Sequence, residues 1–142
     1  MDPSAEIISP RSAADPAVRS PMRYHIAKEA GHITAHLYNR HSPRETAEFL
    51  RATADECSKH GCYNVLISVH RSRPIFTVEK YGFSAFVELA LKHPGRIAIT
   101  ADTSEVRLSH EYAAMLARLR GVNVRAFRDD AAAAAWLERP LK

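Results

Sequence analysis

The sequence predicts a single α/β domain with a mixed five-stranded sheet, in which an antiparallel β-hairpin is followed by parallel βα units. The chain has 142 residues, of which 46% are hydrophobic, and this supports one domain with a buried core. A hairpin pattern opens the folded part, and apolar strand patterns then alternate with helical patterns. This alternation favours parallel strands joined by right-handed crossovers.

The N-terminal residues 1–22 are expected to form a disordered tail ahead of a domain over residues 23–142. The tail contains four prolines among small and charged residues, and it lacks the apolar region of a secretory signal. The other interpretation of these residues is that the start is assigned too early and that Met22 is the initiator. No segment approaches the roughly 18–20 apolar residues of a membrane span. Two cysteines without a secretory signal, Cys57 and Cys62, indicate reduced thiols and a cytoplasmic location.

Residues 24–29 and 32–38 alternate between apolar and polar side chains and are joined by Ala30-Gly31, which predicts a hairpin. The expected register places His25 opposite His36, close enough to share a metal ion. No third ligand is within reach, so we predict a solvated polar face and no metal site. The predicted core face carries Ile26, Ile33, Ala35 and Leu37, and the polar face carries His25, Glu29, His32, Thr34 and His36.

A helix is predicted from Ser42 to His60. Ser42 can cap it, Pro43 suits its first position, and Glu45 can complete a capping box. Gly61 suits the left-handed position that ends a helix. The strand at residues 63–69 follows, and its nearly continuous apolar run is typical of a central strand covered on both faces.

The remaining elements continue the alternation. A helical stretch with a break at Gly82 is predicted over residues 75–91, with Ser84 able to cap its second piece. A strand at 96–100, a helix from about 104 to 120, a strand at 122–127 and a last helix after Asp129 or Asp130 complete the chain. The third helix is expected to place Val106, Leu108, Tyr112, Met115, Leu116 and Leu119 on or near one face, and Trp136 and Leu137 are expected to anchor the last helix.

The polar turn after the central strand, residues 70–74, is the predicted binding site, because ligands of open α/β sheets gather beyond the carboxyl ends of the strands. Two arginines, an imidazole and a hydroxyl next to a helix start suit an anionic group. The adjacent aromatic helix can receive an apolar tail. The predicted site residues are His70, Arg71, Ser72 and Arg73 of the turn, Asp102 of the neighbouring turn, and Phe76 and Tyr81 of the helix.

The net charge of +4 is mildly basic, and no stripe of positive charge with interleaved aromatics is present. We therefore expect no nucleic-acid partner. A small anionic or lipid-like ligand, or a regulatory protein with an acidic surface, requires less positive charge. No motif for a cofactor is present, and none is predicted.

Taken in order, these elements resemble the SpoIIAA-like group, the STAS/SEC14 class of small bacterial α/β proteins. The resemblance covers about residues 23–137. It rests on Val65-Leu-Ile-Ser-Val69 followed by a polar turn, on Arg96-Ile-Ala-Ile-Thr100, and on the ending of the domain. In that ending a strand runs to Phe127, an acidic turn follows, and the last helix closes in Ala-Trp-Leu137.

The resemblance implies a non-enzymatic module that binds a regulatory protein, a nucleotide or, on the SEC14 side, a lipid or other apolar ligand. Some STAS domains are switched by phosphorylation of a serine just after the equivalent of strand 63–69, where this chain has Ser72. The phosphorylated members carry an acidic-serine motif there, whereas Ser72 lies among His70, Arg71 and Arg73. This difference argues against a kinase-switched role.

Two alternative functions fit the sequence less well. A small hydrolase could use Ser72 as nucleophile, His70 as base and Asp102 as the orienting acid. However, Ser72 and His70 lie only two residues apart, and the chain lacks the glycine-flanked serine motif of hydrolases. A homodimer could instead bury the aromatic residues after Pro74.

Overall fold

The computed structural model describes residues 20–74 and 83–139. The strands are β1 (Arg23–Lys28), β2 (Ile33–Tyr38), β3 (Val65–His70), β4 (Arg96–Ala101) and β5 (Asn123–Ala126). The helices are α2 (Pro43–His60), α3 (Phe83–Lys92), α4 (Ser104–Leu119) and α5 (Asp130–Glu138). Within these residues no helix combines the length and the apolar character needed to cross a membrane.

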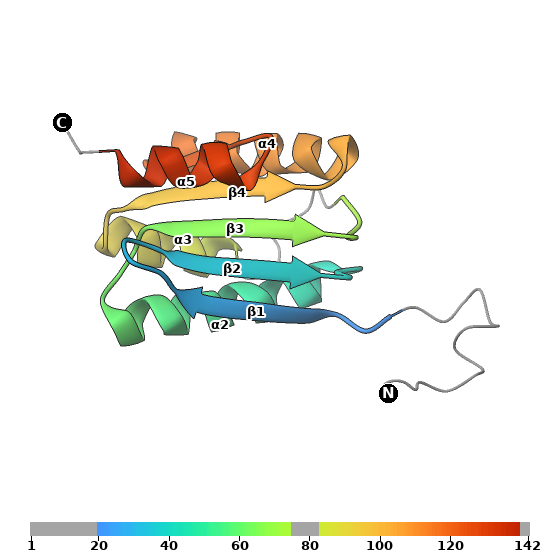
Figure 1. The fold of residues 1–142 in the computed structure, drawn as a ribbon, viewed down its shortest axis with the longest axis horizontal. Coiled ribbons are helices and arrows are strands. Elements are labelled where there is room, and N and C mark those ends of the chain that lie inside the picture. Colours follow the sequence, from blue (N-terminus) through green and yellow to red (C-terminus); the bar gives the residue numbers. More distant parts are fainter. Residues whose placement is uncertain (1–19, 75–82, 140–142) are drawn as a thin grey trace.

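The five strands form one sheet in the order β1-β2-β3-β4-β5. β1 pairs antiparallel with β2, and the other neighbouring pairs are parallel, which confirms the predicted α/β domain with a mixed sheet. Figure 1 shows α5 on the near side of the sheet and α2, α3 and α4 behind it. The sheet is therefore covered unequally, by several helices on one face and by α5 on the other.

The larger core lies between the sheet and helices α2, α3 and α4. It buries the apolar side chains of β2, β3 and β4 against Phe49 of α2, Val87 of α3 and Val106 of α4. A smaller core on the opposite face joins Leu66 and Ala98 to Ala133, Trp136 and Leu137 of α5. β3 is buried over Val65–Val69, which confirms that it is a central strand covered on both faces.

The hairpin has the predicted register. His25 pairs with His36 and Ala27 with Thr34, and the Glu29 N–H donates to the His32 carbonyl at 2.8 Å. Buried Ile33 and Leu37 on β2 confirm the expected core face. One residue of the polar face departs from the expectation, because His32 is buried.

The predicted ends of α2 are confirmed. Ser42 Oγ accepts from the Glu45 N–H, and the Glu45 side chain accepts from the Ser42 N–H, so both halves of the capping box are present. Gly61 ends the helix with a positive φ of 61°. Tertiary packing adds to these local signals, because Phe49 is buried and Tyr24 contacts it edge to face.

Two details of the later helices differ from the prediction. α3 begins at Phe83, so Ser84 lies inside its first turn and does not cap it. On α4 the exposed side chains include Leu108, Met115 and Leu119, which were expected on or near the core face. The core face of α4 instead carries small residues, among them Ala114 and Ala117, because the helix packs closely on β4 and β5.

Met22 packs against the larger core, so the folded domain includes this residue. Residues 1–19 of the predicted tail lie outside the described residues, as do Phe76 and Tyr81 of the predicted site.

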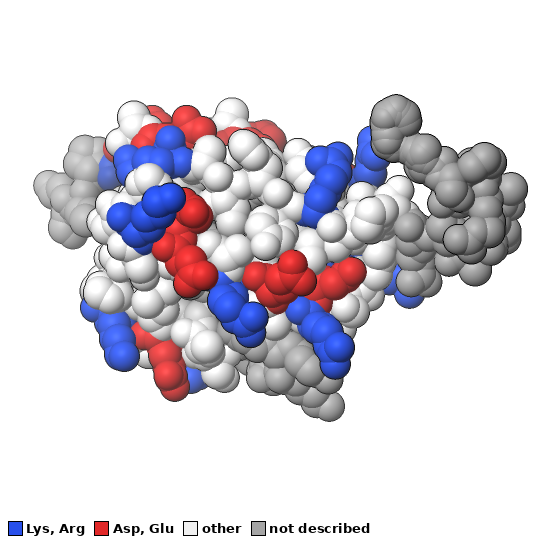
Figure 2. Space-filling model, turned by 90° about the horizontal axis from the view of Figure 1, so that it is seen from below, with Lys and Arg blue, Asp and Glu red and all other residues white. Residues whose placement is uncertain are grey.

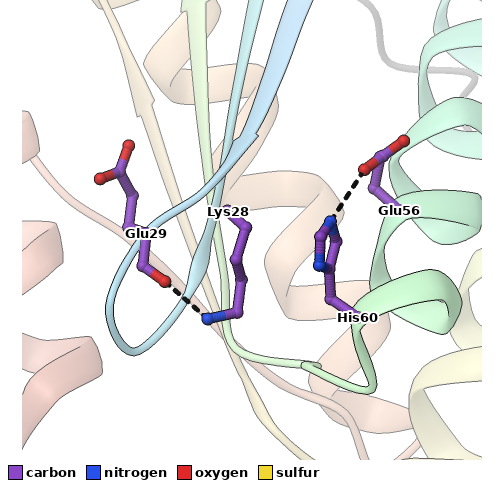
Figure 3. A network of polar contacts seen from close by, with 4 residues as sticks. All are labelled: Lys28, Glu29, Glu56 and His60. Atoms are coloured by element: carbon purple, nitrogen blue, oxygen red, sulfur yellow. Dashed lines mark hydrogen bonds and ion pairs between the residues drawn. The ribbon is translucent and has the colours of Figure 1, made fainter.

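Some of the exposed polar contacts join residues that are close in the sequence. In Figure 2, positive and negative side chains are interspersed on the face that is drawn. Figure 3 shows the Lys28 ammonium on the Glu29 carbonyl oxygen, at 2.7 Å, and the His60 imidazole beside Glu56, at 3.3 Å. These contacts tie neighbouring residues together at the hairpin turn and at the end of α2. Exposed pairs of this kind contribute little stability.

Candidate binding site

The turn after β3 presents its two predicted arginines to solvent. Arg71 and Arg73 are both exposed, and Arg71 adopts a left-handed backbone with φ 52°. The Arg71 N–H donates to Asp102 Oδ2 at 3.0 Å. Asp102 of the neighbouring turn thus contacts the 70–74 turn through the backbone of Arg71.

Ser72 and the His70 ring face different partners. Ser72 Oγ donates to the His70 carbonyl at 2.9 Å and accepts from the Arg40 N–H at 3.1 Å. The His70 Nε2 lies 3.2 Å from His36 Nδ1 and 3.1 Å from Ser68 Oγ. The hydrolase arrangement, which requires the imidazole to contact Ser72 Oγ, is therefore not formed by these contacts.

Arg40 is the basic residue that the structure adds to the turn. It follows β2, next to the end of β3, and is only 4% exposed. Its guanidinium donates to the Arg73 carbonyl, and the Arg73 N–H donates to the Arg40 carbonyl at 3.0 Å. Arg40 and the predicted turn therefore form one unit, although Arg40 and Arg73 are 33 positions apart in the sequence.

The Arg40 guanidinium is charged but incompletely satisfied. Its Nε is buried and has no hydrogen-bond partner. Burial lowers the pKa of Arg40 to about 10, and the carboxylate of Glu45 opposes this shift. Among the described residues, no carboxylate forms an ion pair with it. An unmade hydrogen bond of a buried donor costs about 1–3 kcal/mol, and more for a charged group, so this nitrogen is suited to a ligand oxygen.

His110 of α4 lies near Arg40 and is 7% exposed. Burial, followed by the positive charge of Arg40, lowers the pKa of His110 to about 3. The imidazole is therefore neutral at pH 7, and its buried Nδ1 has no hydrogen-bond partner. Two unsatisfied polar groups thus come from the end of β2 and from α4.

Both groups line an apolar pocket of about 90 Å³ between the sheet and the helices. Phe49, Phe86 and Ala113 contribute walls from α2, α3 and α4. The floor consists of apolar side chains of the sheet, which include Leu37, Ile67, Val69, Ile97, Ile99 and Val124. The site accordingly combines an apolar interior with a guanidinium and an imidazole.

A separate polar network lies on the opposite face of the sheet. Asp130 Oδ1 accepts from Thr100 Oγ1 at 2.5 Å and from Ser68 Oγ at 3.1 Å. Ser68 Oγ also contacts His70 Nε2, which links the carboxylate to the histidine pair. Asp130 is available for this role because Asp129 caps α5.

The sequence analysis missed Arg40, His110 and Asp130 as site residues. Arg40 and His110 lie in a loop and in an amphipathic helix, where the sequence pattern gives no reason for burial. Asp130 was considered only as a possible cap. The polar residues Ser68 and Thr100 inside two apolar strands were the available signal that a polar partner covers this part of the sheet.

In comparisons with known proteins, no family model matched the chain, and no curated protein or solved structure matched it significantly. The SpoIIAA-like family therefore stays a prediction from the order of the elements. The α/β fold rests on the structure itself.

Replacing Asp130 with alanine is expected to reduce the free energy of unfolding by about 3 kcal/mol, because two buried hydroxyls lose a charged acceptor. Asp129→Ala is the matched control, since it removes a helix cap and should cost about 1 kcal/mol. Urea unfolding of both variants at pH 7 measures the difference. Equal losses for the two variants would contradict a structural role of the Asp130 network.

Proposed function

We propose that this protein is a non-catalytic binding domain for a small amphipathic anion, with the anionic group at Arg40 beside the 70–74 turn and the apolar group in the adjacent pocket. The observation that carries the proposal is the buried Arg40 guanidinium, whose Nε is unsatisfied and which lines an apolar pocket. Buried charges in proteins are normally paired. A carboxylate or phosphate oxygen would supply the missing partner.

The pocket limits the size of the apolar group. Its volume of about 90 Å³ is smaller than the roughly 150 Å³ cavity that accommodates a benzene ring. A short or branched chain of a few carbon atoms fits this volume better than a long lipid tail does. Exposed Arg71 and Arg73 stand at the same turn as Arg40, where their positive charge favours the approach of an anion.

The proposal includes a cytoplasmic location, supported by the two free thiols Cys57 and Cys62. The homodimer alternative rests on the aromatic residues after Pro74, and residues 75–82 lie outside the described residues. Among the described residues, exposed apolar side chains lie on α4 and also include Tyr24 of β1 and Leu91 of α3. Exposed apolar side chains are common on protein surfaces and are weaker support than an unpaired buried charge.

The test is calorimetric titration with butyrate, isobutyrate, hexanoate and inorganic phosphate. We expect the short carboxylates to bind the wild-type protein, and Arg40→Met to weaken this binding at least tenfold. Ala113→Leu fills the pocket without changing a charge and should also weaken the binding of the carboxylates. The control is the double variant Arg71→Ala with Arg73→Ala, which removes two exposed charges. Its affinity for the carboxylates should fall only a few-fold, and this loss of affinity should depend strongly on the salt concentration.

If Arg40→Met binds the carboxylates as the wild type does, the anion is not held at Arg40. If only phosphate binds and Ala113→Leu has no effect, the pocket takes no part. Thermal unfolding of each variant shows whether it is folded, and we expect Arg40→Met to be folded because an apolar side chain at this buried position removes an unpaired charge.

A further inference from the structure

His36 and His70 form an unusual pair on the face of the sheet opposite the pocket. They belong to the neighbouring parallel strands β2 and β3. His36 Nδ1 lies 3.2 Å from His70 Nε2, and both rings are partly exposed. α5 packs on β3 and β4, and Figure 1 shows the near side of the hairpin uncovered by a helix. The pair is therefore accessible from solvent.

We propose that His36 Nδ1 and His70 Nε2 bind a divalent transition-metal ion such as Zn²⁺ or Ni²⁺. A zinc–imidazole bond measures about 2.0–2.1 Å, and tetrahedral geometry then places two ligand nitrogens about 3.3 Å apart. The observed separation of 3.2 Å between the two nitrogens is close to this value. Imidazole is a preferred ligand for both metals.

The protons of the pair are consistent with this proposal. In the metal-free pair, one of the two ring nitrogens carries a proton and donates a hydrogen bond to the other nitrogen. When both nitrogens bind a metal ion, the donor ring carries its proton on its other nitrogen. Metal binding therefore replaces the hydrogen bond between the rings with two coordinate bonds. Both rings are neutral before and after binding, so no proton is released.

The surrounding residues hold the His70 ring in place. Its ring stacks on Tyr38 at a centroid distance of 4.7 Å, and its Nε2 also contacts Ser68 Oγ at 3.1 Å. Ser68 in turn donates to Asp130, whose negative charge stabilises a cation nearby. A metal ion on His70 Nε2 takes the place of the contact between this nitrogen and Ser68 Oγ, while the stacking of the ring on Tyr38 remains.

The site is open, with two protein ligands in place. In the described part of the chain, no three histidine, cysteine or acidic side chains converge in a complete metal site. Water molecules would fill the remaining positions. His25 is exposed and paired in register with His36, so rotation of its side chain can add a third imidazole. This site is independent of the proposed anion site, which lies on the other face of the sheet.

The test is a titration of ¹⁵N-labelled protein with Zn²⁺, with NMR detection of the histidine ring nitrogens and calorimetry in parallel. We expect the ring nitrogens of His36 and His70 to shift together. His36→Asn and His70→Asn should each weaken binding at least tenfold, and His25→Ala should weaken it less. His60→Ala is the matched control, because His60 lies at the end of α2 beside Glu56 and should not contribute (Figure 3).

All proteins in this titration carry Cys62→Ser, because Cys62 is partly exposed and a thiolate would compete for zinc. The NMR spectra of the Cys62→Ser protein, with all of its histidines in place, identify the bound nitrogens even if a histidine variant fails to fold. The proposal is overturned if zinc leaves the His36 and His70 nitrogens unshifted, or if both variants bind as tightly as the His60→Ala control.

Discussion

Acidification is expected to destabilise the protein through His110. In the unfolded chain a histidine takes up a proton near its ordinary pKa of 6.5, whereas burial and Arg40 lower the pKa of His110 in the folded state to about 3. Between these values the unfolded state binds more protons, so acid favours unfolding. The free energy of unfolding should fall by up to about 1.4 kcal/mol for each pH unit below about 6, until the pH approaches about 3.

The variant His110→Gln isolates this effect. Urea unfolding of the wild type and the variant is measured at about pH 7, 5.5 and 4. The free energy of unfolding should fall more steeply with acidification in the wild type, and the difference between the two slopes is the contribution of His110. Arg40→Met should also reduce the slope, because the Arg40 charge contributes to the lowered pKa of His110. Identical slopes for the wild type and His110→Gln would show that His110 does not stay neutral in the folded protein.

Replacing Gly95 with alanine is expected to destabilise the protein by about 3 kcal/mol or more. A Cβ atom at Gly95 would lie 2.2 Å from the Tyr63 carbonyl oxygen and 2.7 Å from its carbon. These are backbone atoms that enter β3, so they cannot rotate away as a flexible side chain could. Overpacking typically costs about 1–3 kcal/mol, and a clash with backbone belongs at the upper end of this range.

Gly31→Ala is the matched control, because a Cβ atom at Gly31 in the hairpin turn meets nothing within 4 Å. Its free energy of unfolding should stay within about 0.5 kcal/mol of the wild type. Thermal and urea unfolding of the two variants compare a crowded glycine with an open one. A mild effect of Gly95→Ala would mean that the segment before β4 can shift away from β3 at low cost.

Local signals in the sequence were sufficient for most of the fold. The capping box at Ser42 and Glu45 and the left-handed Gly61 are short-range features, and the structure confirms them. The hairpin register was also predictable, because a slip by one residue would move Ile33 and Leu37 to the wrong face. Strand β3 was recognisable because residues Val65–Val69, apart from Ser68, are apolar on both faces.

The site was harder to predict, because it depends on residues from different elements. Arg40 meets Arg73 only after β2 and β3 pair in parallel, and His110 reaches the same pocket from α4. Leu108, Met115 and Leu119 misled the helix prediction, because close packing of α4 on the sheet favours small side chains such as Ala114. In each case, contacts between elements that are distant in the sequence determined which side chains are buried.

The unequal cover of the sheet has a consequence for local stability. β3 and β4 lie between helices on both faces, whereas β1 pairs with a single strand and has mostly exposed side chains. Amide hydrogens should therefore exchange most slowly at the centre of the sheet and faster in β1. The hairpin flank can open while the centre remains closed, so His25 belongs to the part of the sheet that opens most readily, whereas His70 belongs to the part that opens least.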